Sequence, residues 1–85
     1  MAGITIYTTM LCPYCRRAKD LLNRKGVPFD EVDVTFDPPK RREMMDLANG
    51  RTSVPQILLG QRLIGGCDDL FELDKRGKLD AILAE

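Results

Sequence analysis

The chain has 85 residues, of which 44% are apolar and 31% are charged, so it suits one small globular domain over residues 1–85. Its thirteen basic and thirteen acidic side chains cancel, and without a basic excess we expect no nucleic-acid partner. No apolar run approaches the roughly 20 residues of a membrane helix, so we expect no membrane partner either.

The first half of the chain alternates between strand and helix patterns. Apolar and polar side chains alternate over residues 4–7, which is typical of a strand. From Pro13 to Lys25 the apolar positions follow helical spacing, and Gly26 is suited to end that helix. Residues 29–34 alternate again and predict a second strand.

The second half is expected to contain a helix, a hairpin and two further helices. Asp37 is suited to cap the helix that begins at Pro38, because proline fits the first turn, and Gly50 is expected to end it. Gly60 and Gln61 form a two-residue connection with glycine first, as a type II′ hairpin turn requires. The other predicted segments are the hairpin over residues 56–66, a helix from about Cys67 to Arg76 and a short helix carrying Leu79, Ile82 and Leu83.

This order of elements predicts an α/β fold. The first two strands are joined through a helix, so we expect them to be parallel with a right-handed crossover, whereas the hairpin strands must be antiparallel. The expected architecture is a four-stranded mixed sheet, in the order strand–helix–strand–helix–strand–strand–helix, flanked by helices.

Two cysteines, Cys12 and Cys15, lie three positions apart where the first helix should begin. Pro13 presets the helical backbone angle, which places Cys12 at the N-cap and Cys15 in the first turn. Side chains at this spacing are neighbours, so a disulfide can close with little backbone movement. Cys15 shares the apolar stripe of Ala18 and Leu22. We therefore expect a solvent-facing Cys12 that attacks, helped by backbone N–H groups at the helix start, and a buried Cys15 that resolves.

A zinc site and a structural disulfide are the alternatives for this pair. A structural zinc site usually takes four cysteine or histidine ligands, whereas this chain has no histidine and one further cysteine, Cys67. A disulfide across two residues closes too small a loop to add much stability. An odd number of cysteines without an export signal predicts a cytoplasmic protein whose cysteines start out reduced. The pattern favours redox chemistry and no metal site.

Three motifs together resemble one family. CPYC at residues 12–15, SVP at 53–55 and GGCDD at 65–69 are similar, at these distances, to the dithiol glutaredoxins of the thioredoxin-like superfamily. The resemblance runs from about Ile4 to the end of the chain. It implies a thioredoxin-like fold and a glutathione-dependent thiol–disulfide oxidoreductase, with glutathione as co-substrate and no tightly bound cofactor. Its partners would be glutathione and glutathionylated or disulfide-containing proteins, and we expect a monomer.

The SVP motif is implied to form one wall of a glutathione groove. In the family the bond before the matching proline, here Val54–Pro55, is cis. Val54 would present its backbone N–H and C=O to the cysteine of glutathione, in the way a strand pairs with an extended peptide. Ser53 and Pro55 would flank this edge, and the ring of Tyr14 would lie beside the tripeptide. Without the family context, Pro55 would be an ordinary loop proline and Tyr14 a partly exposed helix residue.

The GGCDD motif is implied to bind the γ-glutamyl end of glutathione. It lies where a strand meets a helix, so the backbone N–H groups of Cys67 and Asp68 are suited to a carboxylate. The Asp68 carboxylate would take the ammonium group, and Gly66 permits close approach of the ligand. Taken alone, Asp68 and Asp69 would merely favour the helix dipole.

A cation should bind the glycine carboxylate of glutathione. The resemblance points to the start of the second helix, where we choose Arg41, with Lys40 and Arg51 as rivals. The chain also departs from the family pattern, because many relatives have a lysine where this sequence has Thr9. A nearby cation that could favour the thiolate or hold glutathione is therefore missing.

The implied chemistry assigns different roles to the two cysteines. Cys12 alone would remove glutathione from mixed disulfides, and Cys12 with Cys15 would reduce protein disulfides. Two other functions are weighed against this one. The first is an iron–sulfur carrier using Cys12 and glutathione across a dimer, which the stiff turn at Pro13 disfavours. The second is a disulfide reductase that depends on thioredoxin reductase.

Overall fold

A computed structural model describes residues 3–84 of the chain. Its elements are β1 (Ile4–Thr8), α1 (Pro13–Arg24), β2 (Phe29–Asp33), α2 (Pro38–Leu47), β3 (Gln56–Leu59), β4 (Arg62–Gly65), α3 (Cys67–Lys75) and α4 (Leu79–Leu83). Every predicted element is present, with ends that differ by one or two residues. Within this described part, no helix has the length and apolar character needed to span a membrane.

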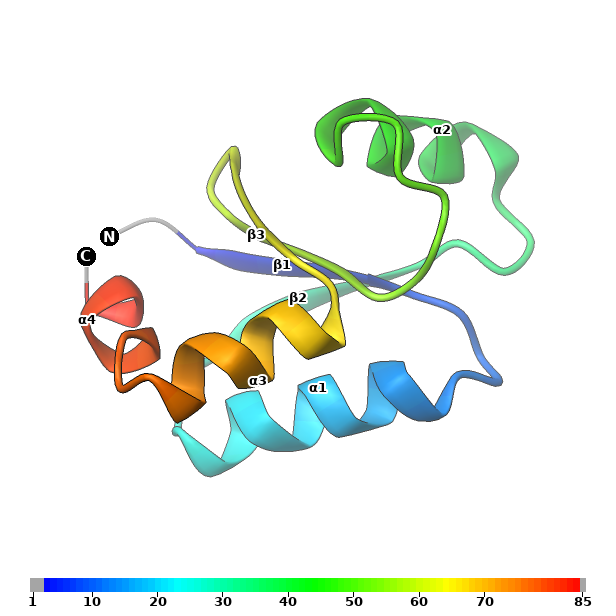
Figure 1. Cartoon of the computed structure of the whole chain (residues 1–85). Helices are drawn as coiled ribbons and strands as arrows, with labels where there is room; N and C mark the ends of the chain where they lie inside the picture. Colours follow the sequence, from blue (N-terminus) through cyan, green and yellow to red (C-terminus); the bar gives the residue numbers. More distant parts are fainter. Residues whose placement is uncertain (1–2, 85) are drawn as a thin grey trace.

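The four strands form one mixed sheet in the order β2-β1-β3-β4. β1 runs parallel to β2, with Ile4 opposite Phe29, and antiparallel to β3, while β3 and β4 form the antiparallel hairpin. Figure 1 shows α1 and α3 on one face of the sheet and α2 on the other. The predicted α/β fold with a four-stranded mixed sheet is thereby confirmed.

The alternation of side chains along β1 and β3 divides the core into two layers. Ile6 and Ile57 face α1 and α3, where they pack with Leu22. Their chain neighbours Tyr7 and Leu58 face the opposite way, and the layer on that side forms under α2. Each sheet face is thus closed by helices.

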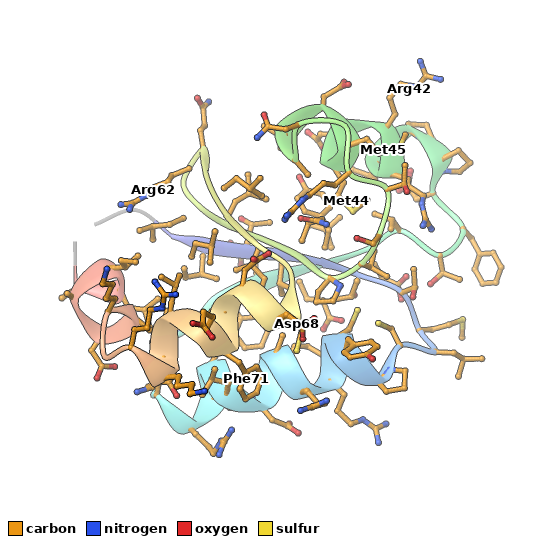
Figure 2. The ribbon with its side chains drawn as sticks, in the orientation of Figure 1. Arg42, Met44, Met45, Arg62, Asp68 and Phe71 are labelled. Atoms are coloured by element: carbon orange, nitrogen blue, oxygen red, sulfur yellow. The ribbon has the colours of Figure 1, made fainter. Side chains whose placement is uncertain are left out.

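The α2 layer is built around a fully buried methionine. Met44 points from α2 towards the sheet, whereas Arg42 points away from it (Figure 2). Met44 packs with Val34, which follows β2 and is also buried. The apolar side predicted for this helix is therefore its buried side.

Helix ends follow the predicted caps, with one correction. The Asp37 side chain accepts the backbone N–H of Lys40 at 3.1 Å, which confirms it as the N-cap of α2. This helix ends at Leu47, earlier than the expected stop at Gly50. Asn49 takes the left-handed conformation (φ 58°) just after the cap, and the Gly50 N–H then bonds back to Met45 O at 2.8 Å. Asparagine tolerates this conformation, so it replaces glycine at that position.

Candidate active site

The three motifs meet because of the strand directions. CPYC follows the end of β1, SVP precedes β3, and GGCDD follows the end of β4. β3 is antiparallel to both β1 and β4, so the end of β1, the beginning of β3 and the end of β4 lie at the same edge of the sheet. The topology of the sheet therefore brings together the cysteine pair, the backbone edge before β3 and the start of α3.

Cys12 is held at the N-cap of α1. Its Sγ accepts the backbone N–H of Cys15 at 3.2 Å, and its thiol points at Val54 O at 3.8 Å. Cys12 is half-buried, and all three cysteines are free thiols. Cys12 Sγ therefore lies at the start of α1, within hydrogen-bond distance of a backbone N–H of the first turn.

Cys15 lies in a very different environment, although it is also a cysteine of the first turn. Its side chain is 2% exposed. Burial, and then a hydrogen bond with Cys12, raises the pKa of Cys15 to about 12, so it remains a thiol at neutral pH. The order of roles expected from the helical stripe, an outer nucleophile and an inner resolving thiol, agrees with these environments.

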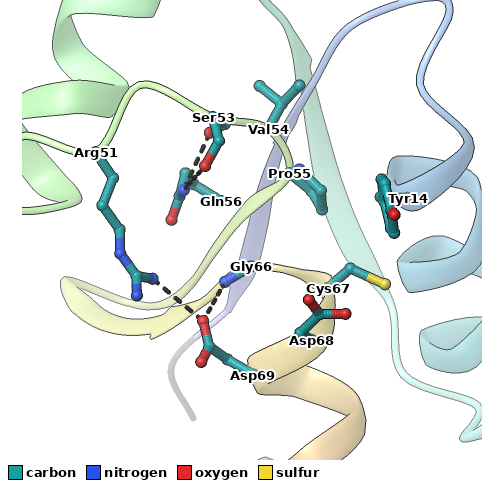
Figure 3. Close-up of a pocket in the computed structure, with 10 residues that line it drawn as sticks. All are labelled: Tyr14, Arg51, Ser53, Val54, Pro55, Gln56, Gly66, Cys67, Asp68 and Asp69. Carbon is teal, nitrogen blue, oxygen red and sulfur yellow. Dashed lines mark hydrogen bonds and ion pairs between the residues drawn. The ribbon is translucent and has the colours of Figure 1, made fainter.

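A groove of about 280 Å³ lies beside Cys12, between α1, the loop before β3 and the start of α3 (Figure 3). It is lined by Tyr14, Arg51, Ser53, Val54, Pro55, Gln56, Gly66, Cys67, Asp68 and Asp69. All the residues predicted to contact glutathione therefore line it, except Arg41. Cys12 itself lies at its rim, within reach of the Val54 backbone.

The loop before β3 is fixed by a buried glutamine. The Val54–Pro55 bond is cis, as the family resemblance implied. The side chain of Gln56 is 1% exposed, and its Nε2 donates to Ser53 O at 3.0 Å and to Ser53 Oγ at 3.3 Å. Gln56 was missed by sequence reasoning, because nothing local distinguishes it from an ordinary strand residue.

The start of α3 is closed by a capping arrangement that also requires glycine. The Gly66 N–H donates to Asp69 Oδ2 at 2.9 Å, as in a capping box. Gly65 has a φ of +123°, and a Cβ atom there would collide with the Asp69 side chain. A Cβ on Gly66 would lie 3.3 Å from Pro55 O, so the loop and the helix approach each other closely. The spacing of Asp69 after the glycines was the signal that could have identified this cap.

Of the cations proposed for the glycine carboxylate of glutathione, Arg51 lines the groove and Arg41 does not. Arg51 lines it, with Nη1 3.1 Å from Asp69 Oδ2, as Figure 3 shows. Arg41 instead donates through Nη2 to Thr52 O at 3.0 Å, on the outer side of α2, and does not line the groove. Arg41 therefore supports the loop from behind, while Arg51 is the cation next to the cavity.

A two-cysteine helix start beside a backbone-lined groove, on this mixed sheet, defines a thiol–disulfide oxidoreductase of the thioredoxin-like fold. The family model described as glutaredoxin matches residues 4–64. The chain is 53% identical to glutaredoxin 3 of Escherichia coli K12 over 83 residues, covering 98% of this chain and 99% of the relative. This chain belongs to the glutaredoxin family.

Two further comparisons agree with this assignment. A glutaredoxin of Pseudomonas aeruginosa is 52% identical over 84 residues, covering 99% of both chains. The solution structure of a glutaredoxin from Brucella melitensis is 49% identical, with a TM-score of 0.85, over 98% of this chain and 89% of that one. The family, fold and enzyme class expected from the three motifs are confirmed.

Proposed function

We propose that this protein uses glutathione to reduce protein–glutathione mixed disulfides through Cys12 alone and protein disulfides through Cys12 and Cys15. The observation that carries this proposal is the position of Cys12 Sγ, which accepts the Cys15 N–H at 3.2 Å and lies 3.8 Å from Val54 O. The more exposed of the two sulfurs is thus the one that lies next to the Val54 backbone. We place the protein in the cytoplasm as a monomer, where glutathione keeps its thiols reduced.

Removal of glutathione from a protein requires one cysteine. The Cys12 thiolate attacks the glutathione sulfur, a Cys12–glutathione disulfide forms, and the protein sulfur leaves as a thiolate that takes up a proton. A second glutathione thiolate then attacks the glutathione sulfur of this intermediate. Glutathione disulfide is released and Cys12 returns as a thiolate, so the net reaction exchanges the protein sulfur of the mixed disulfide for the sulfur of a second glutathione.

Reduction of a protein disulfide uses the buried thiol as well. Cys12 attacks one substrate sulfur and the other leaves as a thiolate. Cys15 then attacks Cys12 Sγ, its proton passes to the departing substrate sulfur, and a Cys12–Cys15 disulfide remains. Burial raises the pKa of Cys15, so we assign its proton to the departing substrate sulfur. Two glutathione molecules reduce the enzyme disulfide and leave as glutathione disulfide.

The groove suits an extended tripeptide with a charged end. The Val54 backbone is placed to pair with the cysteine residue of glutathione. The N–H groups of Cys67 and Asp68 belong to the first turn of α3, which offers them no intrahelical acceptor, and we assign them to the γ-glutamyl carboxylate. The exposed Asp68 carboxylate is assigned to the ammonium group.

The remaining groove residues complete the assignment. Ser53 and Pro55 shape the wall that carries Val54, Gly66 leaves room beside that wall, and the half-exposed ring of Tyr14 lies opposite. We assign a carboxylate of the tripeptide to Arg51 in place of Arg41, because only Arg51 lines the cavity.

Single-cysteine variants test the roles of the two thiols. Cys12→Ser is expected to abolish both activities, whereas Cys15→Ser retains the reduction of a glutathione mixed disulfide and loses that of a protein disulfide. If the mixed-disulfide assay needed both cysteines, the role assignment would be wrong. A visible absorbance band in protein purified without oxygen would indicate an iron–sulfur carrier. Turnover with thioredoxin reductase but not with glutathione would indicate a disulfide reductase that depends on thioredoxin reductase.

A further inference from the structure

A second hollow borders Cys12 and shares no lining residue with the glutathione groove. It has a volume of about 440 Å³. It is lined by Thr9, Met10, Leu11, Cys12, Pro13, Cys15, Arg16, Arg17 and Lys19. None of these except Cys12 and Cys15 takes part in the proposed glutathione chemistry. Because Cys12 lines this hollow, a segment bound in it lies next to the sulfur that attacks a disulfide.

The mouth of this hollow carries large apolar side chains in water. Leu11 is 91% exposed and Met10 is 62% exposed, and nearby Phe36 is 86% exposed. The loops that carry them are joined, because the Met10 N–H donates to Thr35 Oγ1 at 2.8 Å, and Thr35 is fixed in turn by Asp33. Exposed apolar side chains gathered on ordered loops mark an interaction surface. We call Met10 and Leu11, the two exposed apolar side chains that line the hollow, the apolar rim.

The hollow also has a cationic lining. Its lining holds three cationic side chains and no carboxylate. Two of them are engaged: Arg17 lies over the Phe71 ring at 5.6 Å, and Lys19 Nζ binds Glu31 Oε2 at 3.0 Å. The guanidinium of Arg16 makes no hydrogen bond or ion pair with any residue of the described 3–84 span, and it is exposed. Arg16 is therefore the cation available to a partner.

We propose that this hollow docks the polypeptide flank of a protein disulfide, and that it selects a segment with an apolar side chain and a carboxylate next to the attacked cysteine. The apolar side chain packs on the rim and the carboxylate pairs with Arg16. This inference rests on the proposed reduction of protein disulfides. As described there, Cys12 attacks the substrate disulfide and Cys15 then displaces the substrate sulfur. Glutathione has no residue left to reach the hollow once it occupies the groove.

Three peptides of equal length, each with one intramolecular disulfide, test the proposal. They differ only in the residues flanking the cysteines, which are Leu–Glu, Leu–Lys or Ser–Ser. Glutathione and glutathione reductase serve as the recycling system. The wild-type kcat/KM is expected to be about tenfold higher for the Leu–Glu peptide than for the Ser–Ser peptide, because partial burial of one leucine side chain supplies a free energy of about that size. The mixed disulfide of glutathione with free cysteine serves as the small reference substrate.

Two variants assign the effect to the hollow. Leu11→Ser, a change at a solvent-exposed side chain, is expected to remove most of the preference for Leu-containing peptides and to leave turnover of the small mixed disulfide unchanged. Arg16→Glu is expected to reverse the order of the Leu–Glu and Leu–Lys peptides. Arg42→Glu makes the same change of charge on the outer side of α2 and should leave that order intact.

The outcomes separate this inference from the proposed function. Equal wild-type rates on all three peptides would overturn the docking surface, as would a Leu11→Ser variant that slows the small substrate as much as the peptides. A dimer detected by sedimentation and abolished by Leu11→Ser, without peptide preference, would show that a second copy covers the rim and would also overturn it. Failure of the wild-type protein on the small mixed disulfide would instead contradict the proposed function itself.

Discussion

Cys12 and Cys15 are one helical turn apart and chemically opposite. Cys12 Sγ lies where α1 begins and accepts a backbone N–H, while Cys15 faces the core and is almost fully buried. The difference comes from the Pro13 start of the helix, which puts one cysteine before the first turn and the other inside it. The third cysteine, Cys67, is also buried, and burial raises its pKa. Of the three thiols, Cys12 is the one that is partly exposed, and it lies at the N-cap of α1.

This difference predicts the pH dependence of thiol labelling. In the Cys12→Ser variant, Cys15 and Cys67 should resist iodoacetamide at pH 7, and labelling should rise only in alkaline solution. The substitution removes a hydrogen bond to Cys15 but leaves burial, which is the larger cause of its raised pKa of about 12. Mass spectrometry after timed quenching measures the labelled fraction, with urea-unfolded protein as the control. Rapid labelling of the folded variant at pH 7 would contradict the assigned environments.

Between elements, the groove depends on the contact of the loop before β3 with the start of α3. Asp69 Oδ2 accepts the Gly66 N–H and also binds Arg51 Nη1, so one carboxylate joins the helix start to the loop. Both members of the ion pair are about half exposed, at 49% and 47%. An exposed pair adds only about 0–1 kcal/mol to stability, so Arg51 is better explained by the groove than by the fold.

Arg51→Gln is therefore expected to affect glutathione more than folding. Loss of a charged partner for a carboxylate should raise the KM for glutathione about tenfold, and urea unfolding should change by less than about 1 kcal/mol. Arg41→Gln is the matched comparison, because its guanidinium contacts Thr52 O outside the groove. A larger rise in the KM for glutathione for Arg41→Gln than for Arg51→Gln would show that Arg41, the residue chosen from the sequence, binds the glutathione carboxylate.

Sequence patterns predicted elements well because their causes are local. The alternation of side chains predicted the strands, Asp37 predicted a cap, and the spacing of Cys12 and Cys15 predicted that one is partly exposed and the other buried. Which cation lines the groove depends instead on how close the loop at Arg51 comes to Asp69 of α3. The spacing of residues along the chain does not predict that distance. The same holds for Gln56, whose side chain is explained only by the loop it supports.

At the scale of the whole molecule, one carboxylate links three elements next to the site. Glu31 on β2 accepts Thr8 Oγ1 of β1 at 2.7 Å and Lys19 Nζ of α1 at 3.0 Å. The hydrogen bond from Thr8, with a smaller contribution from Lys19, lowers the pKa of Glu31 below its usual 4.5. A carboxyl group with a lower pKa in the folded state stabilises the protein above its unfolded pKa, and this stabilisation is lost as the pH falls through the folded pKa.

Glu31→Gln should consequently destabilise the protein near neutral pH and much less in acid. The expected result is a gap in the free energy of unfolding between wild type and variant that is full at pH 6 and shrinks steadily below pH 4.5. Urea denaturation at several pH values measures this gap. Asp30→Asn, on an exposed neighbour in the same strand, is the control. A gap independent of pH would show that the effect comes from packing and not from the charge.

The molecule measures 34 × 24 × 19 Å, so its two ends are well separated. Figure 1 shows the start of β1 and helix α4 at one end, and the beginning of α1, which carries the dithiol, at the other. A fluorescent reporter or an electrode linker joined next to α4 would therefore leave both hollows around Cys12 open to incoming molecules. Attachment next to α4 would therefore orient the protein on a surface with its dithiol exposed to redox partners.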